Sequence, residues 1–158
     1  MDRLIKEARS MIIFEPHLSG VSGDMLLSAL VDLGADFSLL ERFSSVTGIE
    51  GVAGVKIKRE RVKKKGIMAT KIDVELDEHV HSRHGHEMKE ILAITSRTVE
   101  ASTWAYEKAS EALDYLLEAE AEVHGEEPEE VHLHEAGSFD TILDCLGYFM
   151  LLENLEEN

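Results

Sequence analysis

The chain has 158 residues, of which 44% are hydrophobic, so it can bury the core of one domain and we expect residues 1–158 to form a single domain. Acidic residues outnumber basic ones 32 to 16, and the net charge of −16 disfavours nucleic acid as a partner. No apolar run approaches the roughly 20 residues that cross a bilayer, and the first ten residues lack a signal-peptide pattern. We therefore expect a cytoplasmic protein without membrane contact. Cys145 is the only cysteine, which excludes an internal disulfide, and we interpret it as a buried small apolar residue.

The first predicted elements are a strand, a glycine-containing turn and a helix. Met11–Glu15 is a short apolar run that predicts the strand, and the glycines at 20 and 23 then lead into a helix that ends at Gly34. Ser22 is the expected N-cap of this helix. The helix is predicted to cover a sheet with one apolar face, formed by Leu26, Ala29, Leu30 and Leu33.

Two alternating segments then predict an antiparallel strand pair. A short helix is expected at 37–46, and the strands at 52–60 and 66–76 are joined by a turn at 63–66. The basic stretch from Lys56 to Lys71 lies in this pair and alternates with apolar residues. We interpret it as the solvated face of the strands, with a small local anion site as the alternative.

The second half is predicted to be mainly helical. Helices are expected at 88–99, from a cap at 102 or 103 to about 123, and at 138–155, with a short strand at 131–134. The middle helix should bury one face, formed by Ala105, Ala109, Ala112, Leu113, Leu116 and Val123. The predicted fold class is α/β, with α+β as the alternative: a small mixed sheet that contains an antiparallel strand pair and is covered by helices.

The segment 131–144 concentrates residues that can bind metals or move protons. In an extended run, His132 and His134 point to the same side, and a helix capped by Ser138 would place Asp140 and Asp144 one turn apart. Imidazole and carboxylate groups suit nickel or zinc. The alternative is that Asp140 only complements the helix N-terminus and the histidines make local hydrogen bonds. If the first interpretation holds, we expect these four residues to share one concave site with the Gly20–Asp24 turn.

Two further segments are candidate binding sites. Ser19, Gly20, Ser22 and Gly23 precede a helix, where free backbone N–H groups can bind an anion, although Asp24 opposes this and a tight turn explains the pattern equally well. The polar segment 77–87 carries four histidines, which we expect to form a mobile loop that collects a borderline metal ion. The alternative is a solvated loop without metal. The four are His79, His81, His84 and His86.

Several motifs, taken together, resemble one family. The chain carries S-G-x-S-G-D-M at Ser19–Met25, a histidine-rich loop at 79–86 and A-E-A-x-V-H-G at Ala119–Gly125. It also carries V-H-x-H-E-x-G-x-x-D-x-I-x-D, matched at every fixed position by Val131–Asp144. In this order and over most of the chain, the motifs resemble the amino-terminal part of the LarC-type nickel-insertion proteins.

The resemblance implies a reaction and a set of site residues. It implies insertion of nickel into pyridinium-3,5-bisthiocarboxylic acid mononucleotide, which gives the nickel-pincer cofactor of lactate racemase and related isomerases. The family uses CTP, with Mg or Mn in the full protein. The residues carried over as a site are Asp24, His132, His134, Glu135, Asp140 and Asp144, with the four acidic residues as catalytic candidates. The resemblance does not give their individual roles.

Two departures from the family pattern bear on this expectation. Glu15 stands where the family usually has aspartate, and family members continue well beyond residue 158 into the part that binds CTP. We therefore expect the chain to work with a carboxyl-terminal CTP-binding part, in a longer chain or as a separate subunit, and a homo-oligomer is a further expected arrangement. Whether this chain alone is an enzyme is left open.

Two other functions remain as alternatives. A metal-dependent hydrolase could use the same histidines and carboxylates, because metal-bound water is a ready nucleophile. A non-enzymatic nickel store or assembly module could use the histidines alone. A hydrolase would cleave a substrate by itself, whereas a store would bind nickel without transferring it.

Overall fold

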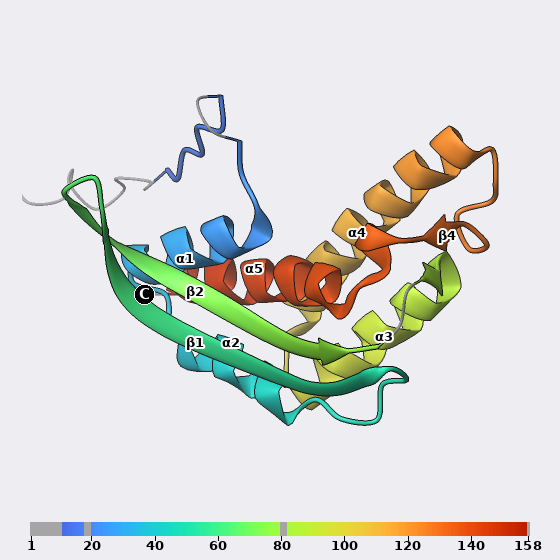
Figure 1. Cartoon of the computed structure of the whole chain (residues 1–158), viewed down its shortest axis with the longest axis horizontal. Coiled ribbons are helices and arrows are strands. Elements are labelled where there is room, and N and C mark those ends of the chain that lie inside the picture. The colour runs from blue at the N-terminus through green and yellow to red at the C-terminus, as the bar shows by residue number, and fades with distance from the viewer. Residues whose placement is uncertain (1–10, 18–19, 80–81, 158) are drawn as a thin grey trace, which may run out of the picture.

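The computed structural model describes residues 11–17, 20–79 and 82–157 (Figure 1). The first half contains α1 (Gly23–Leu33), α2 (Ser38–Glu41), the short 3-10 helix η1 (Arg42–Ser45), β1 (Val52–Lys64) and β2 (Ile67–Glu78). The second half contains β3 (Arg83–His84), α3 (Gly85–Thr98), α4 (Thr103–His124), β4 (His132–Leu133), η2 (Glu135–Gly137) and α5 (Phe139–Glu157).

β1 and β2 form a long antiparallel hairpin whose inner face carries helices. The register runs from Val55 opposite Leu76 to Lys64 opposite Ile67. Lys65 and Gly66 make the tight turn with φ of 48° and 89°, a conformation that glycine adopts without strain. Val55 and Ile72 are buried on the hairpin, and α1 and α5 lie along it in Figure 1. The predicted strand pair and its turn are confirmed.

α5 is the central element of the core. It packs against α1, α2, α3 and α4, and its apolar residues Phe139, Ile142, Leu143 and Leu146 are fully buried. Gly147 lets α2 approach closely, because an added Cβ would lie 2.9 Å from a methyl carbon of Leu40. The helix predicted at 138–155 is therefore confirmed as α5. Its packing against four other helices fixes the direction in which its first turn faces.

The helix signals in the second half are also confirmed. The Ser102 hydroxyl accepts a hydrogen bond from the Ala105 N–H at 3.0 Å at the start of α4, and Gly125 ends the helix with φ of 68°. Glu87 caps α3 by accepting from the His84 N–H at 2.6 Å. α3 therefore begins within the segment predicted as a histidine loop.

Three sequence predictions about these elements need correction. Residues 11–16 are not a strand but exposed chain without regular structure, because no described strand pairs with them. α1 buries Leu27, Leu30 and Val31 while Leu33 is 60% exposed. In α4, Val123 is exposed, and Leu117 and Ala121 are buried in addition to residues 105, 109 and 113. Both helices carry apolar residues on more than one side, so helical spacing alone could not select the buried face.

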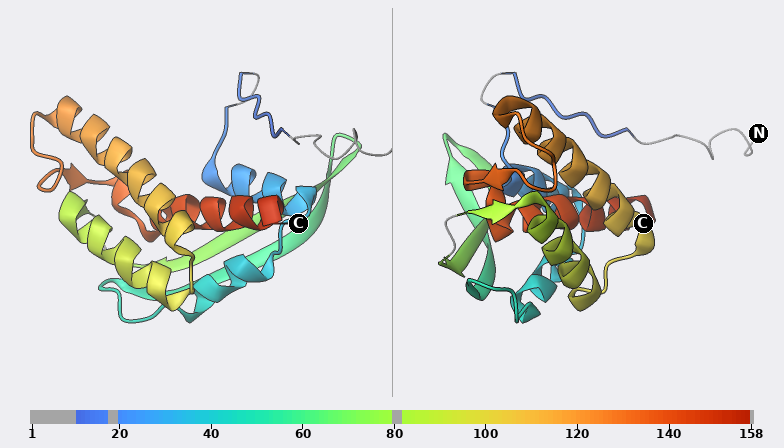
Figure 2. Two further views of the ribbon diagram at one scale, coloured as in Figure 1. Left: turned by 180° about the vertical axis from the view of Figure 1, so that it is seen from behind. Right: turned by 90° about the vertical axis from the view of Figure 1, so that its right-hand side faces the viewer.

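The fold class is confirmed in its α+β form. Both described strand pairs, β1–β2 and β3–β4, are antiparallel, and helices cover the longer pair. Figure 2 shows α3 and α4 packed at the end of the molecule where β3 and β4 meet. Within the described part of the chain, no helix is long and apolar enough to cross a membrane.

Candidate functional site

Asp140 and Asp144, in the first turns of α5, lie beside the start of α1, where Asp24 is close enough to raise the pKa of both. We call Asp24, Asp140 and Asp144 the carboxylate cluster. Gly23 makes the close approach possible, since a Cβ at this position would overlap the Asp144 carboxylate. The predicted placement of Asp140 and Asp144 one turn apart is confirmed by α5, which begins at Phe139. The Ser138 hydroxyl accepts from the Asp140 N–H at 3.0 Å, in agreement with its expected capping role.

Burial and mutual repulsion change the acidity of this cluster. Burial raises the pKa of Asp144 to about 7, with further contributions from Asp140 and Asp24. Burial, Asp24 and Glu78 also raise the pKa of Asp140. The cluster therefore holds a proton near neutral pH, and an incoming cation can displace that proton. Asp24 itself is exposed; the Ser22 hydroxyl donates to it, and it accepts from the Met25 N–H at 2.9 Å.

A buried ion pair holds the start of α5 in place. The Arg83 guanidinium, which is 4% exposed, donates to the Glu78 carboxylate at 2.5 Å and to the Gly137 carbonyl at 2.6 Å. Glu78 also accepts from the Phe139 N–H at 3.1 Å. The pair thereby joins β2, β3 and the first residue of α5. The sequence analysis did not single out Arg83, because a lone arginine in a polar segment carries no burial signal.

The histidines form a second group at the β3–β4 pair. His84 and His132 are opposite each other in the strand register, with ring centroids 3.9 Å apart, and the His86 ring stacks on His84 at 5.5 Å. We call these three residues the imidazole cluster. His84 Nδ1 lies 2.9 Å from the Glu130 carbonyl oxygen, and His86 Nδ1 lies 2.9 Å from that of Glu129.

These carbonyl contacts determine which ring nitrogen is available. A carbonyl oxygen only accepts hydrogen bonds, so Nδ1 of His84 and of His86 must carry the proton. The Nε2 atom of each neutral ring then keeps its lone pair, as in metal-binding histidines oriented by a backbone carbonyl. Sequence spacing could not reveal this grouping, because it depends on the pairing of β3 with β4.

The other predicted site residues are distributed around these two groups. His134 and Glu135 are exposed on the segment between β4 and α5. His79 is exposed and its Nε2 lies 3.1 Å from Asp77. Gly20 has φ of 71°, Ser22 is the N-cap of α1 and Gly23 its first residue. Ser19 and His81 lie outside the described residues.

No preformed metal site is present in the described ranges. Within residues 11–17, 20–79 and 82–157, no three His, Cys, Asp or Glu side chains are arranged to hold a metal ion. Of the two histidines predicted to converge with Asp140 and Asp144, His132 lies against His84 instead, and His134 is exposed between β4 and α5. Cys145 is partly rather than fully buried, and burial raises the pKa of its thiol to about 11, so it stays protonated.

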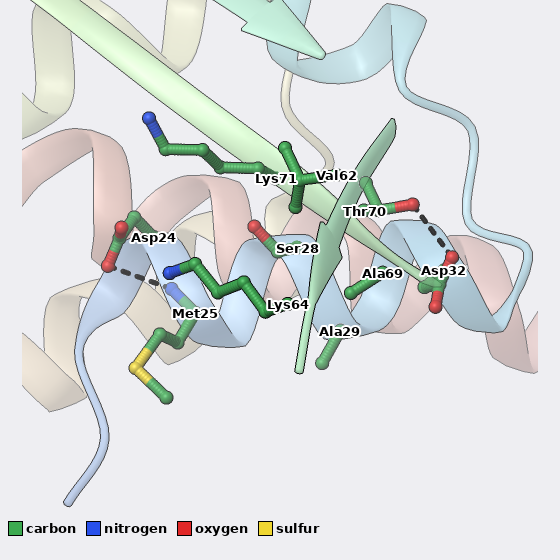
Figure 3. Close-up of a pocket in the computed structure, with 10 residues that line it drawn as sticks. All are labelled: Asp24, Met25, Ser28, Ala29, Asp32, Val62, Lys64, Ala69, Thr70 and Lys71. Atoms are coloured by element: carbon green, nitrogen blue, oxygen red, sulfur yellow. Dashed lines mark hydrogen bonds between the residues drawn. The ribbon is translucent and has the colours of Figure 1, made fainter. Parts of the chain in front are cut away.

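A groove runs between α1 and the β1–β2 hairpin beside the carboxylate cluster. Its volume is about 360 Å³, and Figure 3 shows Asp24 and the amines of Lys64 and Lys71 at the same end. At the other end, the Thr70 hydroxyl donates to Asp32 at 2.7 Å. The two lysines belong to the basic stretch interpreted from the sequence as a solvated strand face.

The fold and the two clusters define an α+β domain that presents carboxylate and imidazole groups, the donor types that bind borderline divalent metals. The family model described as nickel insertion protein matches residues 12–158. The chain belongs to the nickel insertion protein family. No solved structure matches it significantly.

Several curated relatives carry corresponding names. The chain is 42% identical over 132 residues to the pyridinium-3,5-bisthiocarboxylic acid mononucleotide nickel insertion protein of Desulfitobacterium hafniense, covering 82% of this chain and 30% of that protein. It is 40% identical over 142 residues to the protein of the same name from Akkermansia muciniphila, covering 87% and 34%. A putative nickel insertion protein of Dictyoglomus thermophilum is 37% identical over 138 residues, covering 87% and 34%. The chain thus spans about a third of these relatives.

Proposed function

We propose that this chain is the amino-terminal domain of a cytoplasmic protein that inserts nickel into pyridinium-3,5-bisthiocarboxylic acid mononucleotide, with CTP used by the remaining part. The names of the relatives support the nickel cargo and the mononucleotide substrate. The use of CTP, and of the product by lactate racemase and related isomerases, follows from the motif resemblance. The observation that carries the proposal is the carboxylate cluster, which two family motifs from opposite ends of the chain build together.

The carboxylate cluster receives nickel at the site of transfer. Burial, together with the charges of Asp140 and Asp24, raises the pKa of Asp144 to about 7, and a divalent cation bound here would favour the ionised form by displacing its proton. A transfer site has to release its metal, so an incomplete protein ligand set suits this role. The two thiocarboxylic groups of the mononucleotide then supply the sulfur ligands that complete and retain the nickel.

The imidazole cluster provides an earlier contact for nickel. His84 and His86 present Nε2 lone pairs with fixed tautomers, and the His132 ring lies against that of His84. Two or three such nitrogens bind nickel with water completing its coordination. Because the cluster is built on the β3–β4 pair and the start of α3, it captures metal without reorganising the core. His79 and His81, in the same histidine-rich segment of the sequence, remain candidates for further nickel contacts.

The test replaces the amino-terminal part of the Desulfitobacterium hafniense relative with residues 12–158 of this chain. Nickel transfer to the mononucleotide is then measured in the presence of CTP. The chimera is expected to transfer nickel. Asp144→Asn should lower the rate of transfer at least about tenfold, which is equivalent to about 1.4 kcal/mol or more. Glu118→Gln on α4 removes an exposed carboxylate elsewhere and serves as the control. Nickel binding without transfer would favour a nickel store. Substrate cleavage without CTP would favour a hydrolase.

A further inference from the structure

The α1–hairpin groove combines a cavity with hydrogen-bond donors at one end. It is lined by one face of α1, where Asp24, Ser28 and Asp32 follow at helical spacing, and by Val62, Lys64 and Lys71 of the hairpin. The volume of about 360 Å³ falls in the range of small-molecule sites. Figure 3 shows Ser28 between the Lys64 and Lys71 side chains.

The two ends of the groove differ in how their charges are satisfied. At one end, Asp32 accepts from both Arg61 and Thr70, with its Oδ1 atom 2.5 Å from the Arg61 guanidinium and 2.7 Å from the Thr70 hydroxyl. At the other end, Lys64 has no ion-pair partner among the residues that the structure describes. The Lys71 amine donates to Asp73 at 2.7 Å and is 43% exposed, so it has further N–H donors to offer.

Ser28 adds a directional donor between these lysines. Its hydroxyl oxygen accepts a hydrogen bond from the Ile72 N–H at 2.8 Å, which fixes the side chain against β2. Because the oxygen is used as an acceptor, the hydroxyl proton of this groove-lining residue can still be donated to a ligand. Two ammonium groups and one hydroxyl proton form a donor set for a phosphate rather than for a cation.

We infer that this groove binds the phosphate of the mononucleotide substrate through Lys64, Lys71 and Ser28, while the pyridinium ring extends past Asp24 to the carboxylate cluster. This inference rests on the proposed function. The arrangement places the positively charged ring beside carboxylates and the phosphate beside lysines, so each end of the substrate meets the opposite charge. It also places the thiocarboxylic groups next to the carboxylates that hold the nickel.

The binding test uses nicotinic acid mononucleotide, a pyridinium carboxylate mononucleotide, and the corresponding nucleoside without phosphate. Isothermal titration of the whole chain should show binding of the mononucleotide and at least tenfold weaker binding of the nucleoside. The double variant Lys64→Gln/Lys71→Gln should weaken mononucleotide binding at least tenfold, and Ser28→Ala about threefold. Lys56→Gln/Lys63→Gln removes the same charge from the hairpin outside the groove and should bind like the natural sequence.

Three results would overturn the inference. They are an unchanged Kd in the groove double variant, equal binding of nucleoside and mononucleotide, and CTP binding tighter than mononucleotide binding, which would assign the groove to the other nucleotide. Thermal melting of each variant separates a binding loss from a folding loss.

Nickel transfer by the chimera distinguishes this inference from the proposed function. If the chimera transfers nickel, the groove double variant should raise KM for the mononucleotide at least tenfold while kcat stays within twofold. If the groove double variant transfers nickel with an unchanged KM, the groove inference is rejected and the proposed function is not. A chimera that binds the mononucleotide through the two lysines but transfers no nickel rejects the proposed function and leaves the phosphate site in place.

Discussion

The carboxylate cluster and the imidazole cluster hold their metal-binding groups in two different ways. In the first cluster, Asp144 lies close against Gly23, and burial raises its pKa to about 7. The imidazoles lie on a short strand pair, and backbone carbonyls fix the tautomers of His84 and His86. In the proposed function, a cation replaces the proton of the first group, whereas the second group offers its Nε2 lone pairs to incoming nickel. A protein that passes nickel on needs both properties, capture and release.

The largest effect on stability is expected at the buried ion pair, which joins the regions that carry the two clusters. Arg83→Ala leaves the Glu78 carboxylate buried without its cationic partner and removes the hydrogen bond to the Gly137 carbonyl just before α5. We expect a loss of about 3 to 5 kcal/mol in the free energy of unfolding, measured by urea denaturation. Arg97→Ala, at an exposed position of α3, is the control and should change stability by less than about 0.5 kcal/mol. A similar small loss for Arg83→Ala would mean that the buried pair does not hold the two regions together.

The next effect concerns the proton on Asp144. The pKa of Asp144 is about 7 in the folded state against 3.8 without the fold, so the folded protein binds the extra proton between these values. The free energy of unfolding therefore falls as pH rises from about 4 to 7. Asp144→Asn removes this fall and should stabilise the metal-free chain by about 2 kcal/mol at pH 8, with little effect at pH 4. Thermal melting across this pH range checks the sign. A destabilised variant at pH 8 would show that Asp144 is not under electrostatic strain.

A smaller change in stability is expected from Gly23→Ala. The added Cβ occupies the space of the Asp144 carboxylate, which has to turn away from the cluster. Because a side-chain end can move more easily than backbone, we expect a stability loss of about 1 kcal/mol. The pKa of Asp144 should move down toward its usual value, as measured by carboxyl NMR, and nickel affinity should fall about tenfold. A pKa that stays near 7 would show that the close approach does not confine this carboxylate.

The smallest stability effect is expected in the imidazole cluster. Replacing His84, His86 and His132 with glutamine keeps polar groups on partly exposed positions and should change unfolding by less than about 1 kcal/mol. Nickel capture, measured with a competing chelator, should weaken at least tenfold. His124→Gln on α4 is the control, since this residue lies outside the cluster and pairs with Glu120 in the same helix. Unchanged nickel affinity in the triple variant would assign this cluster a structural role.

Local sequence patterns predicted the helices and strands of this protein better than they predicted the contacts between them. The hairpin, the Ser102 cap and the Gly125 end follow from alternation and from residue-specific backbone preferences, which act within a few residues. The strand expected at 11–15 is absent because a strand needs a partner, and no described strand pairs with this segment.

The site shows the same limit. Asp140 and Asp144 could be placed on one face from helical spacing, and their meeting with Asp24 was expected from the family motifs. The grouping of His132 with His84 and His86 depends on β3 pairing with β4, two-residue strands that no periodicity reveals. Arg83, Ser28 and Lys64 acquire their roles only through burial and orientation, which the identity of a single residue does not encode.

The central claim is that nickel binds the carboxylate cluster by displacing the proton of Asp144. The direct measurement is calorimetric titration of nickel at pH 6.5 in buffers of different ionisation enthalpy, with the His84, His86 and His132 glutamine variant to remove the imidazole sites. Since the pKa of Asp144 is about 7, the account predicts release of roughly 0.8 proton for each nickel bound, and almost none after Asp144→Asn. Nickel binding without proton release, or with equal release in the Asp144→Asn variant, would contradict it.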